Sequence, residues 1–105
     1  LVGFSQGTMM SLHVGLRRHA DMAGIIGFSG AMTMPDHWRE EITSKPPVIL
    51  IHGDNDGVVP VELMQEAYLA LISIGVKVDK HVSPGVTHSI GPDGRQKALD
   101  FIEKL

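Results

Sequence analysis

The stretch Leu1-Val2-Gly3-Phe4-Ser5-Gln6-Gly7 frames a serine between two glycines in the pattern Gly-x-Ser-x-Gly, and this pattern indicates the fold. The apolar residues before Ser5 predict the end of a buried strand, and the proline-free segment 6–19 predicts a helix. In this pattern the serine lies in a sharp, strained turn, and the positions two before and two after it must be small. We therefore expect Ser5 above the edge of a sheet, at the positive end of the following helix.

Strand and helix patterns alternate along the rest of the chain. Strands are predicted at 1–4, 23–28, 48–51 and 76–82, and helices at 6–19, at 60–74 and at a final amphipathic segment with Ala98, Leu99, Ile102 and Leu105; a single helical turn is predicted at 36–42. The apolar run Val48-Ile49-Leu50-Ile51 is typical of a parallel strand covered on both faces. Apolar side chains surround most of the helix 6–19, which predicts its burial. This order indicates an α/β fold with about four parallel strands and flanking helices.

The composition is that of one small folded domain, residues 1–105. Hydrophobic residues make up 43% and charged residues 20%, within the globular range. The net charge is -3 and the longest basic run is Arg17-Arg18, so no surface for nucleic acid is expected. The absence of cysteine excludes disulfides, thiolate zinc sites and a cysteine nucleophile. No apolar stretch approaches the ~20 residues of a membrane span.

A serine hydroxyl becomes a useful nucleophile when a histidine, held by a carboxylate, takes its proton. Candidates for both groups follow later strands: His52-Gly53-Asp54-Asn55-Asp56-Gly57-Val58-Val59-Pro60 comes after the third, and Gly85-Val86-Thr87-His88-Ser89-Ile90 after the fourth. The carboxyl ends of parallel strands share one edge, where ligands bind in open α/β sheets. The order Ser, Asp, His predicts a catalytic group of Ser5, Asp56 and His88.

Asp54 competes with Asp56 for the carboxylate role. The order and loop position of such a triad favour Asp56, and Asp54 is expected to organise the turn by bonding backbone N–H groups. A simple polar turn is the alternative for the whole segment 54–57. A calcium loop is excluded, because its glycine would stand at the sixth position and Gln65 occupies the place of the bidentate glutamate.

The other histidines have simpler interpretations. His13 and His19 are six apart, a spacing that does not suit a metal pair on a helix. His52 is interpreted as a hydrogen-bonded structural residue, and His81 as a solvated residue on an edge strand. The long connection after the second strand contains Met32, Met34 and Trp38. These side chains are interpreted either as part of a substrate-facing insertion or, at least equally well, as a packed patch of the core.

These residues resemble the carboxylesterase/phospholipase branch of the α/β hydrolases, which includes acyl-protein thioesterase-like enzymes. The matching pieces are Gly3-Phe4-Ser5-Gln6-Gly7, His52-Gly53-Asp54-x-Asp56 with Val58-Val59-Pro60, and Thr87-His88-Ser89-Ile90. The resemblance implies that Ser5 is the nucleophile, Asp56 the acid and His88 the base, and that the Gln6 backbone N–H is one oxyanion donor. It further implies hydrolysis of small carboxylic esters, with thioesters and lysophospholipids as further candidates, and no cofactor or metal.

Members of that family have several strands before the serine, so the resemblance covers the C-terminal portion of the α/β-hydrolase fold. The first strand, Leu1 to Phe4, is therefore expected to lie at a sheet edge unless a missing N-terminal segment or a second copy of the chain covers it. The alternative hypothesis is a catalytically incomplete fragment that exists through oligomerisation or such pairing. The lack of cysteine and of a basic leader favours the cytoplasm.

Overall fold

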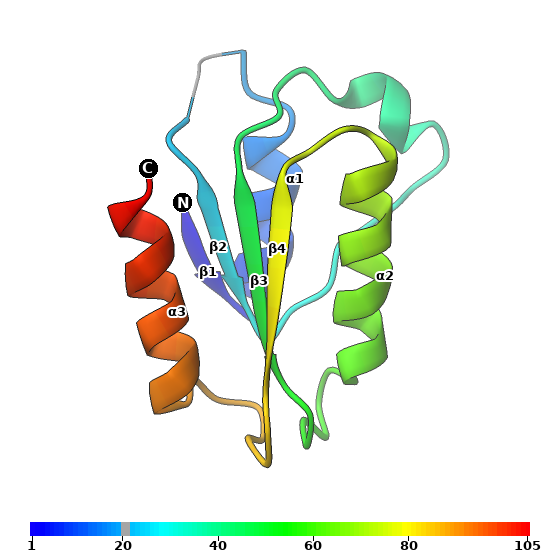
Figure 1. Ribbon diagram of the computed structural model, residues 1–105. Coiled ribbons are helices and arrows are strands. Elements are labelled where there is room, and N and C mark those ends of the chain that lie inside the picture. The colour runs from blue at the N-terminus through cyan, green and yellow to red at the C-terminus, as the bar shows by residue number, and fades with distance from the viewer. Residues whose placement is uncertain (20–21) are drawn as a thin grey trace.

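The computed structural model describes residues 1–19 and 22–105, and its elements follow the predicted alternation (Figure 1). In chain order they are β1 (Val2–Phe4), α1 (Gln6–Gly15), β2 (Ile25–Phe28), the short 3-10 helix η1 (Trp38–Glu41), β3 (Val48–Gly53), α2 (Val61–Ser73), β4 (Val78–Ser83) and α3 (Pro92–Glu103). The α/β fold class and the four parallel strands are confirmed.

The sheet order is β1-β2-β3-β4, which is also the order of the strands along the chain. Each connection leads to the neighbouring strand, always toward the same side of the sheet. Right-handed crossovers therefore place all three connections on one face of the sheet. One core cluster accordingly joins α1, η1 and α2 to that face, and a second, smaller cluster lies between the other face and α3. Figure 1 shows α2 and α3 on opposite sides of the sheet, with α1 behind it.

The third strand, β3, is covered on both faces, which explains its apolar run Val48-Ile49-Leu50-Ile51. All six of its residues are buried. Leu50 packs into the α1/α2 cluster, whereas Ile49 and Ile51 pack into the α3 cluster, because successive side chains of a strand point to opposite faces. The loop after β3 therefore begins at a strand that is covered on both faces and held in place.

Two helices differ from the sequence-based expectations in what they bury. α1 ends at Gly15 rather than near residue 19, and its Met10 is 63% exposed, so the predicted burial of the whole helix is wrong. Of the stripe predicted for the final helix, Ala98 is buried, whereas Leu99 and Ile102 of α3 and Leu105 after it are exposed.

The rotation of α3 has a local cause. Gly94 faces the sheet, where a Cβ atom would lie 2.8 Å from Cγ2 of Ile51. Ala98 and Phe101, four and seven residues later, lie on the same side of the helix and pack with Ile51. The smallest residues of the helix thus allow its close approach to β3, and they decide which face is buried.

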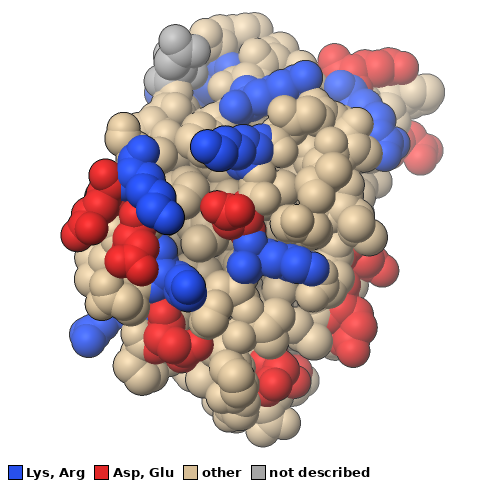
Figure 2. Space-filling model, viewed as in Figure 1, with Lys and Arg blue, Asp and Glu red and all other residues tan. Residues whose placement is uncertain are grey.

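The edge formed by β1 lies opposite β4 in the sheet order, and Leu1, Val2 and Phe4 are all exposed there. Over the face shown in Figure 2, basic and acidic side chains are interspersed. Within the described residues, no helix is long and apolar enough to cross a membrane.

Candidate active site

Ser5 lies in a strained turn between β1 and α1. Its φ of 56° and ψ of −116° lie in a region that non-glycine residues rarely adopt, at a cost of about 1–3 kcal/mol. The surroundings hold this conformation, because the Ser5 N–H donates to the Phe28 carbonyl at 2.9 Å. The Ser5 carbonyl in turn accepts from the N–H groups of Thr8 and Met9, at 3.0 and 3.3 Å. The sharp turn predicted from the sequence is therefore present.

The two glycines of the pattern have different surroundings. A Cβ atom on Gly3 would overlap the backbone of Gly7, so a side chain at Gly3 would push β1 away from the first turn of α1. A Cβ atom on Gly7 would have no described atom within 4 Å. The expectation of a small residue is confirmed at Gly3, and the described residues place no close neighbour beside Gly7.

Thr8 supports the turn from behind, and sequence reasoning missed it. Its side chain is 1% exposed, and its hydroxyl donates to the Phe28 carbonyl at 2.7 Å. That carbonyl therefore accepts from both Thr8 and Ser5. Gly30 packs here as well, since a Cβ atom on it would lie 2.5 Å from the Thr8 Cβ and 2.7 Å from the backbone carbonyl oxygen of Ser5. A hydroxyl residue in the first turn of a helix is common, so the sequence carried no specific signal for this role.

The structure brings the three predicted side chains together at the carboxyl edge of the sheet. His88 Nε2 lies 3.0 Å from Ser5 Oγ, and His88 Nδ1 lies 2.7 Å from Asp56 Oδ2. An ionised carboxylate only accepts hydrogen bonds, so Nδ1 carries the proton that Asp56 accepts. In the neutral ring Nε2 is then free to accept the proton of the serine hydroxyl. The Phe4 ring lies against His88, with 5.0 Å between the ring centroids.

Asp56 is held as an anion by its own loop. Its side chain is 0% exposed, and its Oδ1 accepts from the N–H groups of Val58 and Val59, both at 2.8 Å. Burial alone would raise the pKa of this carboxyl group, but the hydrogen bonds from His88, Val59 and Val58 lower it below its ordinary value. The group is therefore charged at neutral pH, with Oδ2 directed at His88.

The loop after β3 is tied to the loop after β4. Asp54 accepts from the N–H of Gly85 at 2.7 Å, which agrees with its predicted role as an organiser of backbone N–H groups. Asn55 N–H donates to the Val86 carbonyl at 3.0 Å. A Cβ atom on Gly53 would overlap that same carbonyl. These contacts fix the distance between the loop of Asp56 and the loop of His88.

The first residue of α1, Gln6, was predicted to supply an oxyanion donor. The first N–H groups of a helix have no acceptor within the helix, and the Gln6 N–H is one of them. It directly follows Ser5, so it is available to a negative oxygen that forms on a substrate bound to that serine.

Of the remaining candidates, His52 is buried and hydrogen-bonded, as expected, with Nε2 2.7 Å from the Val59 carbonyl. The interpretation of His81 as a solvated residue is wrong, because its Nε2 lies 2.6 Å from Asp93 Oδ2 at the start of α3. Trp38 and Met32 are buried in the core, which favours the packing interpretation for both residues. The described residues contain no group of three potential metal-ligating side chains, counting histidine, cysteine and carboxylates.

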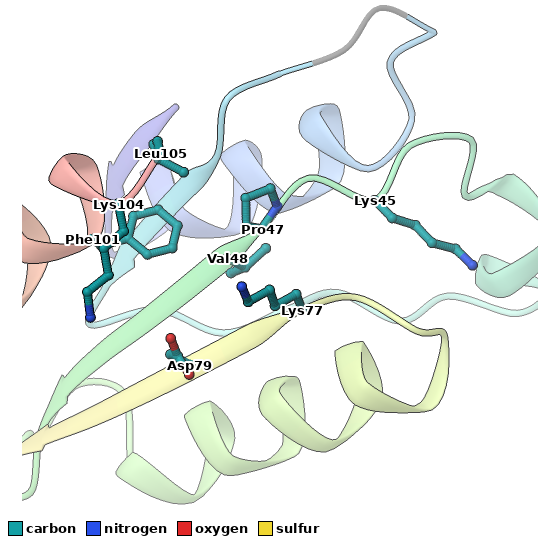
Figure 3. Close-up of a pocket in the computed structure, with 8 residues that line it drawn as sticks. All are labelled: Lys45, Pro47, Val48, Lys77, Asp79, Phe101, Lys104 and Leu105. Atoms are coloured by element: carbon teal, nitrogen blue, oxygen red, sulfur yellow. The ribbon is translucent and has the colours of Figure 1, made fainter.

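Two surface hollows lie at different places relative to Ser5. One, of about 480 Å³, adjoins the start of α1 and is lined by Gln6, Met9, Met10, His13 and Thr33. The other, of about 230 Å³, is shown in Figure 3 and is lined by residues that include Val48, Lys77 and Lys104. Val48 begins β3, so this second hollow lies at the amino edge of the sheet. Ligands of parallel sheets bind at the carboxyl edge, which favours the first hollow as a substrate site.

Comparisons with known proteins agree on one family. The family model described as phospholipase/carboxylesterase matches residues 1–105. Acyl-protein thioesterase 1 of Gibberella zeae is 30% identical, over 99% of this chain and 46% of its own length. Lysophospholipase-like protein 1 of Mus musculus is 27% identical, over 95% of this chain and 44% of its own.

Solved structures give the same result. The crystal structure of esterase PE8 is 47% identical and superposes with a TM-score of 0.95, over 99% of this chain and 48% of that one. SOBER1 of Arabidopsis thaliana is 25% identical with a TM-score of 0.91, over 98% and 50% of the two chains. The chain spans about half the length of the curated relatives and solved structures named here.

Proposed function

Because the chain belongs to the phospholipase/carboxylesterase family, we propose that it is the catalytic part of a serine hydrolase that cleaves carboxylic esters and thioesters. The observation that carries the proposal is the continuous hydrogen-bonded path from Ser5 Oγ through His88 to Asp56. Nucleophile, base and acid stand in the order and at the distances that acyl transfer needs.

The reaction proceeds in two steps through an acyl-enzyme. Ser5 Oγ attacks the carbonyl carbon while its proton passes to His88 Nε2, and the resulting negative oxygen accepts from the Gln6 N–H. His88 then gives the proton to the departing alcohol or thiol, which leaves the acyl group on Ser5. A water molecule, deprotonated by His88, attacks that acyl group; the acid is released and the serine recovers its proton. Asp56 remains charged and stabilises the imidazolium in both steps.

We assign the acyl group of the substrate to the hollow beside Gln6. The side chains of Met9 and Met10 form its apolar lining, and unbranched thioethers adapt to flexible hydrocarbon chains. Met10→Glu should lower kcat/KM for long-chain p-nitrophenyl esters more than for the acetate. Met34→Glu is the matched control, because Met34 is also exposed but does not line this hollow. An equal loss for all chain lengths would contradict the placement.

A serine-directed fluorophosphonate tests the proposal as a whole. With the full-length gene product, the probe should add its mass to the peptide that holds Ser5, and Ser5→Ala should abolish labelling and ester turnover. Ser29→Ala is a suitable control, because Ser29 stands in the similar stretch Gly27-Phe28-Ser29-Gly30 and also has a positive φ, 51°. Labelling that persists in Ser5→Ala would identify a different nucleophile.

The edge strand supports a second candidate, in which residues 1–105 act only in association. Exposed strand edges favour pairing, and Leu1, Val2 and Phe4 expose apolar side chains at the edge of β1. A further strand from the same polypeptide or from a second copy would cover them. In α/β hydrolases a second oxyanion donor comes from a loop that precedes the nucleophile in the chain. With one donor in place of two, residues 1–105 alone should lose ~10²–10³-fold in rate and be a poor esterase. A monomer of this length, verified by mass and light scattering, with the turnover of the full-length gene product would contradict this.

A further inference from the structure

His52 lies outside the three proposed catalytic residues but directly against one of them. It is the penultimate residue of β3, and its side chain, like that of Asp56, is 0% exposed. His52 Nε2 lies 2.7 Å from the Val59 carbonyl oxygen and 3.4 Å from Asp56 Oδ2. This buried histidine, at the base of the loop that holds Asp56, takes no part in the proton transfers of the proposed mechanism.

The partners of the ring decide its protonation. A carbonyl oxygen only accepts hydrogen bonds, so the contact with Val59 requires a proton on His52 Nε2. Nδ1 is buried, and among the described residues it has no hydrogen-bond partner. A proton on Nδ1 would be a buried donor without an acceptor, which is costly. The ring is therefore the neutral Nε2–H tautomer, and it acts as a donor rather than as a second base.

We propose that His52 is a positioning residue that aims the carboxylate of Asp56 at His88. Its Nε2–H holds the carbonyl of Val59, and the N–H of that same residue, with the N–H of Val58, holds Asp56 Oδ1. With Oδ1 fixed in this way, Oδ2 is left for His88 Nδ1 at 2.7 Å. This inference rests on the proposed function, since it assigns His52 to the same reaction.

His52 also lies against the acid itself. Its Nε2 is 3.4 Å from Asp56 Oδ2, while its N–H is directed at the Val59 carbonyl. A carboxylate rotated away from this position would give up the hydrogen bonds that Oδ1 accepts from Val58 and Val59. Because His52 belongs to the buried strand β3, its bond to the Val59 carbonyl ties the loop that holds Asp56 to a fixed strand.

Two variants of the full-length gene product separate the effect of the His52 hydrogen-bond donor from the effect of its side-chain volume. His52→Leu keeps a similar volume but removes the donor, and we expect kcat to fall about 10²-fold with KM little changed, the scale associated with a misplacement of about 1 Å. His52→Gln can place an amide N–H near the position of Nε2 and should recover most of this loss. Equal activity of His52→Leu and the parent protein, or equal losses in both variants, would overturn the proposal.

A spectroscopic measurement tests the inference without turnover. In the parent protein, nitrogen NMR should find His52 protonated at Nε2 only, and the downfield proton of the His88–Asp56 hydrogen bond should persist in His52→Gln and broaden in His52→Leu. A proton on His52 Nδ1 would overturn the inference, even if His52→Leu does not fold. Failure of the proposed function would appear separately, as absence of fluorophosphonate labelling with these signals intact.

Discussion

Two histidine–aspartate pairs in this molecule have nearly the same contact distance but different surroundings. His88 and Asp56 are 2.7 Å apart, and His81 and Asp93 are 2.6 Å apart. Asp56 is 0% exposed and accepts two backbone N–H groups, whereas the side chain of Asp93 is 40% exposed at the start of α3. His81 uses Nε2 for its carboxylate, while His88 uses Nδ1 and keeps Nε2 for Ser5.

The difference shows that a short contact between a histidine and a carboxylate does not make a catalytic pair. The acid must be buried so that water does not screen it, and its free oxygen must be held so that it does not rotate. The ring must also present its second nitrogen to a nucleophile. Among the two pairs only His88 and Asp56 meet all three conditions, and β4 and α3 use the other pair as a surface contact.

The largest expected effect separates the two pairs by activity. Asp56→Asn should lower kcat by about 10⁴-fold, because an amide at this position can favour the wrong tautomer of His88. Asp93→Asn removes the same charge from the surface pair and should leave kcat close to that of the parent protein. Steady-state ester hydrolysis by the full-length gene product measures both. A comparable loss in the two variants would mean that the surface pair also supports the reaction.

The next effect concerns the packing that brings the loop of Asp56 against the loop of His88. Gly53→Ala should destabilise the fold by about 1–3 kcal/mol, because its Cβ would overlap the Val86 carbonyl. Gly57→Ala is the matched control four residues later, where a Cβ meets no described atom within 4 Å, so its stability should be unchanged or slightly higher. Urea unfolding compares them, and equal stabilities would refute the close contact.

A smaller effect is expected for Asp54, which links the same two loops. Asp54→Ala removes the acceptor of the Gly85 N–H and should cost about 1 kcal/mol of stability, while kcat changes far less than in Asp56→Asn. Asp54→Asn keeps a side-chain oxygen and should retain part of the stability. Thermal unfolding and turnover are measured on the same samples. If Asp54→Asn lost the activity that Asp56→Asn retained, the two aspartates would have to exchange roles.

The smallest effect is a dependence of stability on acid. Burial opposes the charge of Asp56, but its hydrogen bonds from His88, Val59 and Val58 lower its pKa in the folded protein. The unfolded chain therefore binds this proton at a higher pH, so the contribution is present above about pH 4 and is lost as the pH falls through the folded pKa.

Unfolding free energies measured between neutral and strongly acidic pH test this sign. The Asp56→Asn variant should lose less stability than the parent protein over that interval. Asp93→Asn should act in the same direction, because the hydrogen bond from His81 lowers the pKa of Asp93. Its effect should be smaller, since solvent screens the exposed pair. An unchanged acid slope in Asp56→Asn would contradict the assignment.

Local sequence patterns were enough to predict the order of elements and the grouping of Ser5, Asp56 and His88. Each of these residues lies at or just beyond the end of a segment with a strand pattern, and parallel strands bring their carboxyl ends to one edge. This inference needs only local patterns and a topological rule, so it does not depend on any side-chain position. The apolar run of β3 predicted a fully covered strand for the same reason, and that prediction is confirmed.

Contacts between segments far apart in the chain could not be predicted from such patterns, and they became visible only in the folded structure. The pairing of His81 with Asp93, the close approach of Gly3 to Gly7 and the hydrogen bond from Thr8 to the Phe28 carbonyl depend on how elements approach each other. The buried face of α3 likewise depends on the small Gly94 meeting β3, and no hydrophobic count along the helix could locate it. Periodicity specifies which side chains share a face of an element, whereas the distance and rotation between elements follow from packing, which is a property of the whole core.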